Sequence, residues 1–219
     1  MAIEGGEGSG KSTQSRLLAE MLGAHLTREP GGTKVSELVR ALVLDPQLVG
    51  MDAKAETLLM LAARAQHTSE VINPVLSSGR WVISDRFSAS TLAYQGYGRG
   101  LALDELRLLA AWATSGRWPE LNVLLDVPPE VAEGRHRLRP DRLEREDRHF
   151  HERVRQGFFE LASSEPDLWA VVDGSGDPLV VLERILCEVC ARLGVPSSAT
   201  EPARKMLADA HILRDSRGH

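Results

Sequence analysis

A glycine-rich segment near the N-terminus, EGGEGSGKST at residues 4–13, constrains this chain more than any other feature. Gly5 and Gly10 are separated by four residues and followed by Lys11 and Ser12, the spacing G-x-x-x-x-G-K-[ST]. In such loops backbone N–H groups surround a phosphate, the lysine reaches the outer phosphate oxygens and the hydroxyl ligates Mg²⁺. Glycine permits close backbone approach and positive φ. We therefore predict that ATP binds here, at Gly5, Gly6, Glu7, Gly8, Ser9, Gly10, Lys11, Ser12 and Thr13.

Short apolar segments alternate with amphipathic ones along the chain. Strands are expected at 1–4, 24–27, 81–84, 122–127 and 168–173. Helices are expected at 12–22, 33–44, 53–77, 102–115, 129–138, 143–163 and 178–193. Strands this apolar are covered on both faces, which predicts an α/β fold with a doubly wound, five-stranded parallel sheet and helices on both faces. This is the three-layer P-loop NTPase fold, and ligands should bind beyond the carboxyl ends of its strands.

The chain of 219 residues suits one domain, which we place at 1–194, with a C-terminal tail at 195–219 that is peripheral or disordered. The net charge of −5 argues against a general binder of nucleic acid or membrane surfaces. No apolar run is long enough to span a membrane, and the glycine loop stands where a signal peptide would need an apolar region. We expect a cytoplasmic protein. Cys187 and Cys190 lie in a helical pattern and are expected to be small packing residues rather than a redox or zinc pair.

The segment WVISDRF places Asp85 and Arg86 at the end of a predicted strand. An aspartate there can hold Mg²⁺ through water, together with Ser12, and the arginine can face a second phosphate. The alternative is a salt-bridged pair that only caps the strand. A guanine-reading N-K-x-D element does not occur in the sequence, which disfavours a GTPase switch.

The segment RLRPDRLEREDRHFHERVR is rich in arginine and is interrupted by Pro140. Three arginines of its second half are expected on a solvated helix face: Arg148, Arg153 and Arg155. Three others flank the interruption and are candidates for a lid at about 135–145 that closes on the nucleotide: Arg137, Arg139 and Arg142.

These residues resemble the bacterial thymidylate kinases. The resemblance rests on EGGEGSGKSTQ, TREPGGT, AETLLMLAARAQH, SDRFSASTLAYQGYGRGL, LDVPPEV and DRLEREDRHFHERVRQGFFELA, and it extends to about residue 193. It implies that ATP and dTMP are converted to ADP and dTDP, with Mg²⁺, in dTTP biosynthesis. It also implies a homodimer formed through the helices near 53–77 and 102–115.

The resemblance implies the roles of the residues around the acceptor. Arg28 and Arg86 would hold the dTMP phosphate, and Glu7 would accept a hydrogen bond from the 3′-hydroxyl. Arg64 would bind thymine O4, and Thr91 would lie beside N3. The remaining members of the predicted acceptor site are Tyr94 beneath C2′, Met60 at the base, and Ser90 and Gln95.

Two positions depart from common family patterns. Met60 stands where many relatives have a phenylalanine against the thymine ring. Gly8 stands where one type of family member carries its catalytic arginine, so this chain resembles the type with that arginine in the lid. Arg142 is the first candidate, with Arg137 and Arg139 in reserve, and Lys11 and Asp85 complete the predicted catalytic set.

Two alternatives remain open from the sequence. The first is a kinase of another small acceptor, such as dUMP, CMP or shikimate, on the same scaffold. The second is a non-catalytic nucleotide-binding switch, which would not require the arginine lid.

Overall fold

A central parallel sheet organises the molecule. The computed structural model describes residues 1–134 and 140–196. The sheet has the order β2-β3-β1-β4-β5, and every pairing in it is parallel. Its strands are β1 (Ala2–Glu4), β2 (His25–Arg28), β3 (Val82–Asp85), β4 (Asn122–Asp126) and β5 (Trp169–Asp173). All five strands start and end within one residue of their predicted positions, and the predicted doubly wound α/β fold is confirmed.

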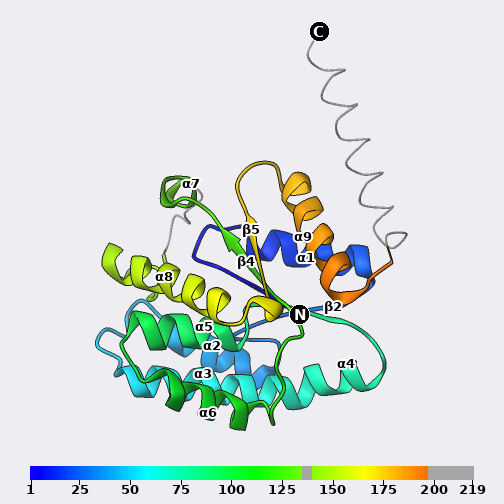
Figure 1. Ribbon diagram of the computed structural model, residues 1–219. Coiled ribbons are helices and arrows are strands. Elements are labelled where there is room, and N and C mark those ends of the chain that lie inside the picture. The colour runs from blue at the N-terminus through cyan, green and yellow to red at the C-terminus, as the bar shows by residue number, and fades with distance from the viewer. Residues whose placement is uncertain (135–139, 197–219) are drawn as a thin grey trace.

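Helices cover both faces of this sheet (Figure 1). On one face α1 (Lys11–Leu22) and α9 (Pro178–Leu193) form a core with alternate strand residues such as Ile3, Val123 and Leu125. On the other face Leu124 packs into a second core with α8 (Arg148–Ser164) and its residue Phe150. Because successive strand residues serve opposite cores, the strands are apolar throughout.

An outer group of helices lies beyond the second core. It consists of α2 (Lys34–Leu44), α3 (Ala53–His67) and α6 (Leu103–Ala113), near the bottom of Figure 1. A third small core joins α3 to α6 through Leu61, Ala110 and Ala113. None of the helices in the described ranges is long and apolar enough to cross a membrane.

The predicted helix at 53–77 is observed as three helical segments that follow one another without a break. After α3 the chain forms a π-helical turn, Thr68–Ile72, and then α4 (Asn73–Ser77). Pro74 lies in the first turn of α4 and has no N–H to donate to the preceding turn, which accounts for the change of helical pitch.

A helical segment at residues 88–98 was not predicted. It comprises α5 (Ser88–Thr91) and a second π-helix, η2 (Leu92–Gly98). Gly96 and Gly98 lower its intrinsic helix propensity, but they are needed for packing. A Cβ at Gly98 would lie 2.6 Å from Cε2 of Phe150, so glycine lets α8 approach closely.

Two other predicted helices are shorter than expected. The helix expected at 143–163 begins at Arg148, because the Asp147 carboxylate caps it by accepting from the Phe150 N–H at 2.7 Å. Before it, the Asp141 carboxylate accepts from the N–H groups of residues 143 and 144, at 2.9 Å each, and holds a turn. The helix expected at 129–138 is α7 (Pro129–Glu133), and residues 135–138 lie outside the described residues. A short 3₁₀ turn, η3 (Pro166–Leu168), precedes β5.

Candidate active site

The glycine loop joins β1 to α1 and directs the helix N-terminus at a cavity of about 390 Å³. Gly5, Gly8 and Gly10 all have positive φ, and a Cβ at Gly5 would lie 2.7 Å from the Leu125 carbonyl oxygen. Lys11 Nζ donates to the Gly6 carbonyl at 2.6 Å. Burial, with Arg86 adding to its effect, lowers the pKa of Lys11 to about 8 in spite of Glu7 and Asp85, so the negative charge of a bound phosphate would further stabilise the ammonium form.

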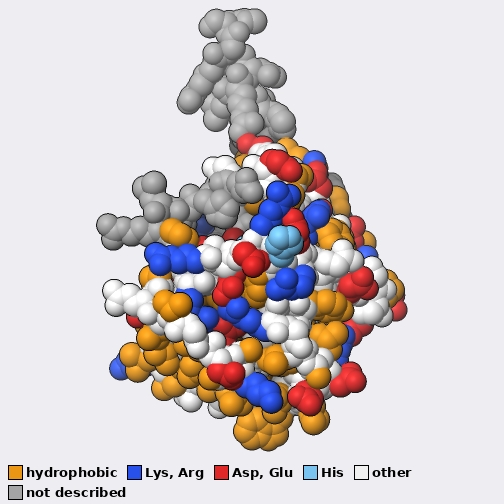
Figure 2. All heavy atoms as spheres, turned by 90° about the vertical axis from the view of Figure 1, so that its left-hand side faces the viewer, with side chains coloured by type: hydrophobic (Ala, Val, Ile, Leu, Met, Phe, Trp, Pro, Cys, Tyr) orange, Lys and Arg blue, Asp and Glu red, His pale blue; other side chains and the backbone are white. Residues whose placement is uncertain are grey.

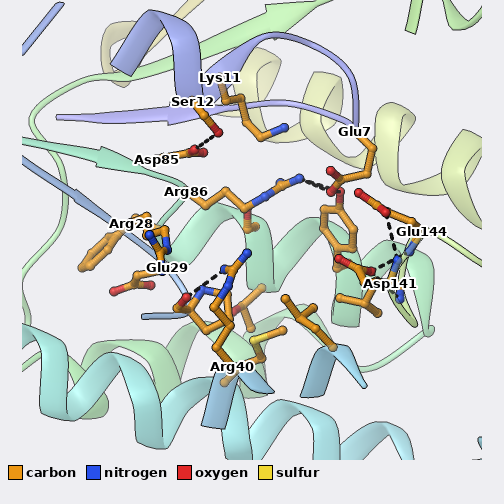
Figure 3. A pocket seen from close by; sticks show the side chains of 18 of the residues that line it. Glu7, Lys11, Ser12, Arg28, Glu29, Arg40, Asp85, Arg86, Asp141 and Glu144 are labelled. Atoms are coloured by element: carbon orange, nitrogen blue, oxygen red, sulfur yellow. Dashed lines mark hydrogen bonds and ion pairs between the residues drawn. The ribbon is translucent and has the colours of Figure 1, made fainter. Parts of the chain in front are cut away.

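Ser12 and Asp85 meet at one end of the cavity (Figure 3). The Ser12 hydroxyl donates to Asp85 Oδ2 at 2.5 Å, and both residues line the cavity. Hydroxyl and carboxylate oxygens are the donors that Mg²⁺ prefers, so the pair fits that ion. Within residues 1–134 and 140–196 no group of three or more His, Cys, Asp or Glu residues could hold a metal. Mg²⁺ is commonly held by one or two protein groups together with substrate phosphates, and this pair is of that kind.

Arg86 lies at the centre of the cavity and points toward Glu7 (Figure 3). Its guanidinium forms an ion pair with the Glu7 carboxylate and donates to the Tyr94 hydroxyl at 3.0 Å and the Gly5 carbonyl at 2.9 Å. Arg86 has a φ of 70°, an uncommon conformation for a residue other than glycine. Its ion pair is with Glu7 of the loop, so it does not act as a simple cap of the strand with Asp85.

Glu7 is held as an ionised acceptor. Burial alone would raise its pKa, but Arg86 and then Lys11 outweigh burial and lower the pKa of Glu7 to about 2. The Tyr94 hydroxyl donates to the same carboxylate at 3.0 Å. Burial raises the pKa of Tyr94, so its hydroxyl stays a donor. The carboxylate of Glu7 thus joins the phosphate loop to the helix η2.

Glu4 lies behind Arg86 and is fully buried. Its carboxylate accepts from the Phe87 N–H at 2.8 Å and from the Ser90 hydroxyl at 2.6 Å. Burial raises the pKa of Glu4 to about 7, although both hydrogen bonds and Arg86 oppose the rise. Glu4 therefore supports the turn that carries Arg86.

The same cavity is also lined by Met60, Arg64 and Thr91. Arg64 is buried and held at three points. Its Nε donates to Glu29 at 2.6 Å, one Nη donates to the Thr91 hydroxyl at 2.8 Å, and the other donates to the Phe87 carbonyl at 3.1 Å. Since a guanidinium has five N–H groups, two remain for a ligand.

Two further arginines line the cavity, Arg28 at the end of β2 and Arg40 on α2 (Figure 3). Arg28 is 53% exposed at its side chain and donates to both Glu37 carboxylate oxygens, at 2.9 and 3.0 Å. Arg40 donates to the Pro30 carbonyl at 2.9 Å and was not predicted, because it lies in the amphipathic pattern of α2 with no motif around it. Desolvation lowers the pKa of Arg40, and Arg28 adds to that effect.

Arg142, the first candidate for the catalytic arginine, does not line the cavity. It is only 9% exposed, and it donates to the Val43 carbonyl at 2.8 Å and to Glu56 at 2.6 Å. Glu56 also accepts from Gln95 at 2.8 Å and from Arg99 at 3.0 Å. Burial opposes the ionised form of Glu56, but these donors outweigh it and lower its pKa. In this structure Arg142 ties the segment before α8 to α2 and α3.

The structure brings most of the predicted site residues to one cavity: Glu7, Gly8, Gly10, Lys11, Ser12, Thr13, Arg28, Met60, Arg64, Asp85, Arg86, Ser90, Thr91, Tyr94 and Gln95. Gly5, Gly6 and Ser9 belong to the loop without lining the cavity, and Arg137 and Arg139 lie outside the described residues. The cavity also has lining residues that were not named individually from the sequence, namely Glu29, Pro30, Arg40, Leu44, Phe87, Asp141, Leu143 and Glu144. The last three lie within the predicted lid segment at about 135–145.

The arginines expected on a solvated face differ among themselves. Arg148 is 79% exposed at its side chain and pairs only along its own helix with Glu152, as expected. Arg153 donates to the Gly98 carbonyl, and Arg155 pairs with Asp126. Those two join α8 to neighbouring elements.

Comparison with known proteins decides the family. The family model described as thymidylate kinase matches residues 3–185. The chain belongs to the thymidylate kinase family. A thymidylate kinase of Synechococcus sp. (strain JA-2-3B'a(2-13)) is 46% identical over 209 residues, covering 92% of this chain and 99% of the relative. A thymidylate kinase of Carboxydothermus hydrogenoformans is 50% identical over 185 residues, covering 81% and 90% of the two chains.

A solved structure supports the same assignment. The crystal structure of thymidylate kinase from Ehrlichia chaffeensis superposes with a TM-score of 0.72 at 34% identity, covering 86% of this chain and 96% of that one. The protein is therefore a phosphotransferase of the thymidylate kinase family with the P-loop NTPase fold, as the sequence predicted. Kinases of other acceptors and non-catalytic switches are not favoured by these comparisons.

Proposed function

We propose that this enzyme transfers the γ-phosphate of ATP to dTMP and forms ADP and dTDP for dTTP biosynthesis. The observation that carries the proposal is that one cavity is lined both by the phosphate-loop residues Lys11 and Ser12 and by Arg64 and Thr91. A phosphate donor and a nucleotide acceptor would share this cavity, with Arg86 between them.

At the donor end the loop would bind the ATP phosphates. Lys11 would exchange its bond to the Gly6 carbonyl for phosphate oxygens, which are better partners for a desolvated ammonium. Ser12 and Asp85 would hold Mg²⁺, which neutralises charge on the phosphates when it is bound.

At the acceptor end Arg86 and Arg28 would hold the dTMP phosphate. Arg86 is already fixed by Glu7, Tyr94 and Gly5, so it would lose little further freedom on binding. A phosphate oxygen is already anionic, so in-line attack on the γ-phosphorus needs no general base. Glu7 can only accept hydrogen bonds when ionised, and it would therefore favour an acceptor with a free 3′-hydroxyl.

The base would lie between Met60 and the polar pair of Arg64 and Thr91. The remaining N–H groups of Arg64 match the O4 acceptor of thymine. The thioether of Met60 would contact the ring face, which is a favourable but less orienting contact than aromatic stacking.

The catalytic arginine is proposed to come from the lid. The sequence ranked Arg142 first, but the buried pairing of Arg142 with Glu56 favours a role in anchoring the lid to α2 and α3. We therefore rank Arg137 and Arg139 ahead of Arg142 as the residues that meet the γ-phosphate during transfer.

A homodimer is proposed through α3 and α6. Apolar side chains on these helices are exposed, with Leu108 at 72%, Trp112 at 81% and Leu58 at 59%. Figure 2 shows hydrophobic side chains along the lower edge of the molecule, where Figure 1 places these helices. A second copy would cover this surface. The cytoplasmic location stays a prediction from the sequence.

A steady-state assay of ADP release tests the proposed function. ADP should form with ATP, Mg²⁺ and dTMP together, and only at a trace rate when dTMP is left out. ADP release at one rate with and without dTMP would indicate an ATPase or a switch and would refute the proposal.

A further inference from the structure

A buried chain of three side chains lies behind Arg64. His67 is fully buried, and its Nε2 lies 2.6 Å from the Thr27 hydroxyl. Its Nδ1 lies 2.9 Å from Glu29 Oε1, and the other Glu29 oxygen accepts from Arg64 Nε at 2.6 Å. The chain Thr27–His67–Glu29 therefore ends on the arginine proposed to bind the base.

The direction of the hydrogen bond between His67 and Glu29 can be assigned. A carboxylate oxygen only accepts, so His67 Nδ1 carries a proton and donates to Glu29. The bond fixes one oxygen of Glu29, and Arg64 takes the other. Without His67, the Glu29 carboxylate would be free to rotate about its terminal torsion, and the arginine would lose a fixed partner.

The surroundings hold the imidazole in place. A Cβ at Gly32 would lie 2.8 Å from His67 Cδ2, so the turn after β2 packs directly on the ring. Because Thr27 and Glu29 belong to the end of β2 and its following loop, while His67 and Arg64 share one face of α3, the chain ties the loop to that helix.

We infer that His67 is a positioning residue for base recognition, acting through Glu29 to orient Arg64. The inference rests on the proposed role of Arg64 at the base. An N–H of a fixed arginine pairs with O4 of thymine, whereas cytosine presents a donor amine at the same place. A guanidinium that can turn would lose part of this discrimination, so His67 contributes to the choice of acceptor without touching it.

Two replacements of similar shape distinguish the hydrogen bond made by Nδ1 of His67 from the one made by Nε2. In His67→Asn the amide nitrogen lies near the position of Nδ1 and keeps a donor for Glu29. In His67→Gln the amide lies near the position of Nε2, keeps the contact with Thr27 and leaves Glu29 unsupported. Ile185→Val, a buried change in the core between the sheet and α9, is the control for a general loss of stability.

The measurement is kcat/KM for dTMP and for dCMP, with the KM for ATP and the thermal unfolding of each variant. We expect His67→Gln to lower the ratio of kcat/KM for dTMP to kcat/KM for dCMP by about tenfold or more, through a higher KM for dTMP. One well-formed base contact is worth about that much discrimination. His67→Asn should keep most of the ratio, and Ile185→Val all of it. The KM for ATP should not change.

The inference is overturned if His67→Gln and His67→Asn both keep the wild-type ratio, or if both lose it equally. If His67→Gln does not fold, Thr27→Val removes the other support of the ring and should lower the ratio, and Thr27→Ser should restore it. Equal ratios in those two variants would also overturn it. Failure of the proposed function is distinct, because the wild-type enzyme would then form no dTDP.

Discussion

Arg142→Ala should destabilise the protein and leave turnover nearly unchanged. The substitution removes a charged hydrogen bond to Glu56 and a second bond to the Val43 carbonyl, both from a side chain that is only 9% exposed. Breaking a buried ion pair costs about 3–5 kcal/mol when the remaining charge has no other partner. Glu56 keeps Gln95 and Arg99, so we expect a lower cost, about 2–3 kcal/mol.

This loss of stability corresponds to a measurable decrease in Tm. For a chain of this size each kcal/mol lowers Tm by about 2–4 °C, so Arg142→Ala should unfold about 4–12 °C below the wild type. Circular dichroism gives the transition, and a coupled ADP assay well below it gives kcat. We expect kcat within about threefold of the wild type, because Arg142 would meet no charge that develops during transfer.

The matched variants complete the test. Arg137→Ala or Arg139→Ala should lower kcat by about 10²-fold or more with little change in Tm, as expected for a group that acts in the transition state. Arg148→Ala, which removes only an exposed pair within α8, should change neither quantity. If Arg142→Ala unfolds like the wild type but loses about 10²-fold in kcat, the anchoring role is refuted and Arg142 is the lid arginine.

Three further predictions concern single side chains. Lys11→Ala should reduce kcat to below about a tenth of the wild type without changing the circular dichroism spectrum, because its charge acts on phosphate oxygens; a rate above that level would contradict its assignment. Met60→Phe should lower the KM for dTMP, by stacking worth about 0.5–1.5 kcal/mol at most, and not the KM for ATP; equal shifts for both substrates would mean that Met60 is only a core residue. Glu4→Gln tests a pH effect, because the pKa of Glu4 is raised from 4.5 to about 7 by burial, so its contribution to stability is fully present below pH 4.5 and is lost as pH rises through about 7. Urea unfolding of the neutral Gln variant should show a smaller fall in stability across this window, and curves of the same shape for both proteins would show that Glu4 does not titrate there.

The elements that the sequence predicted well are those set by local pattern. The five strands are apolar because each contributes to two cores, and the phosphate loop has a fixed spacing of glycines, lysine and serine. Each strand and the phosphate loop can be recognised from a segment of about ten residues or fewer. The helical segment at 88–98 was missed because Gly96 and Gly98 oppose helix formation locally, whereas their packing against Leu103 and Phe150 requires them.

The site shows the same division. Residues in motifs, such as Arg86 and Lys11, line the cavity as expected. Arg40 was missed because it lies in no motif and its place in the cavity depends on how α2 packs. Glu29 lies in the motif TREPGGT but was given no role, because its partners Arg64 and His67 come from α3. Arg142 shows the opposite case. An arginine in a predicted lid segment can either face the nucleotide or form a buried ion pair, and only the position of Glu56 on α3 shows that Arg142 forms the ion pair.

The selection of dTMP as the phosphate acceptor of ATP can be measured with a panel of acceptors. Purified enzyme with ATP and Mg²⁺ would be given dTMP, dUMP, dCMP, CMP and shikimate in turn, and the phosphorylated product identified by chromatography. We predict dTDP as the main product, with kcat/KM for dTMP above that of every other acceptor and dCMP among the poorest, because Arg64 donates where cytosine also donates. A higher kcat/KM for dUMP, CMP, dCMP or shikimate than for dTMP would contradict the proposed function.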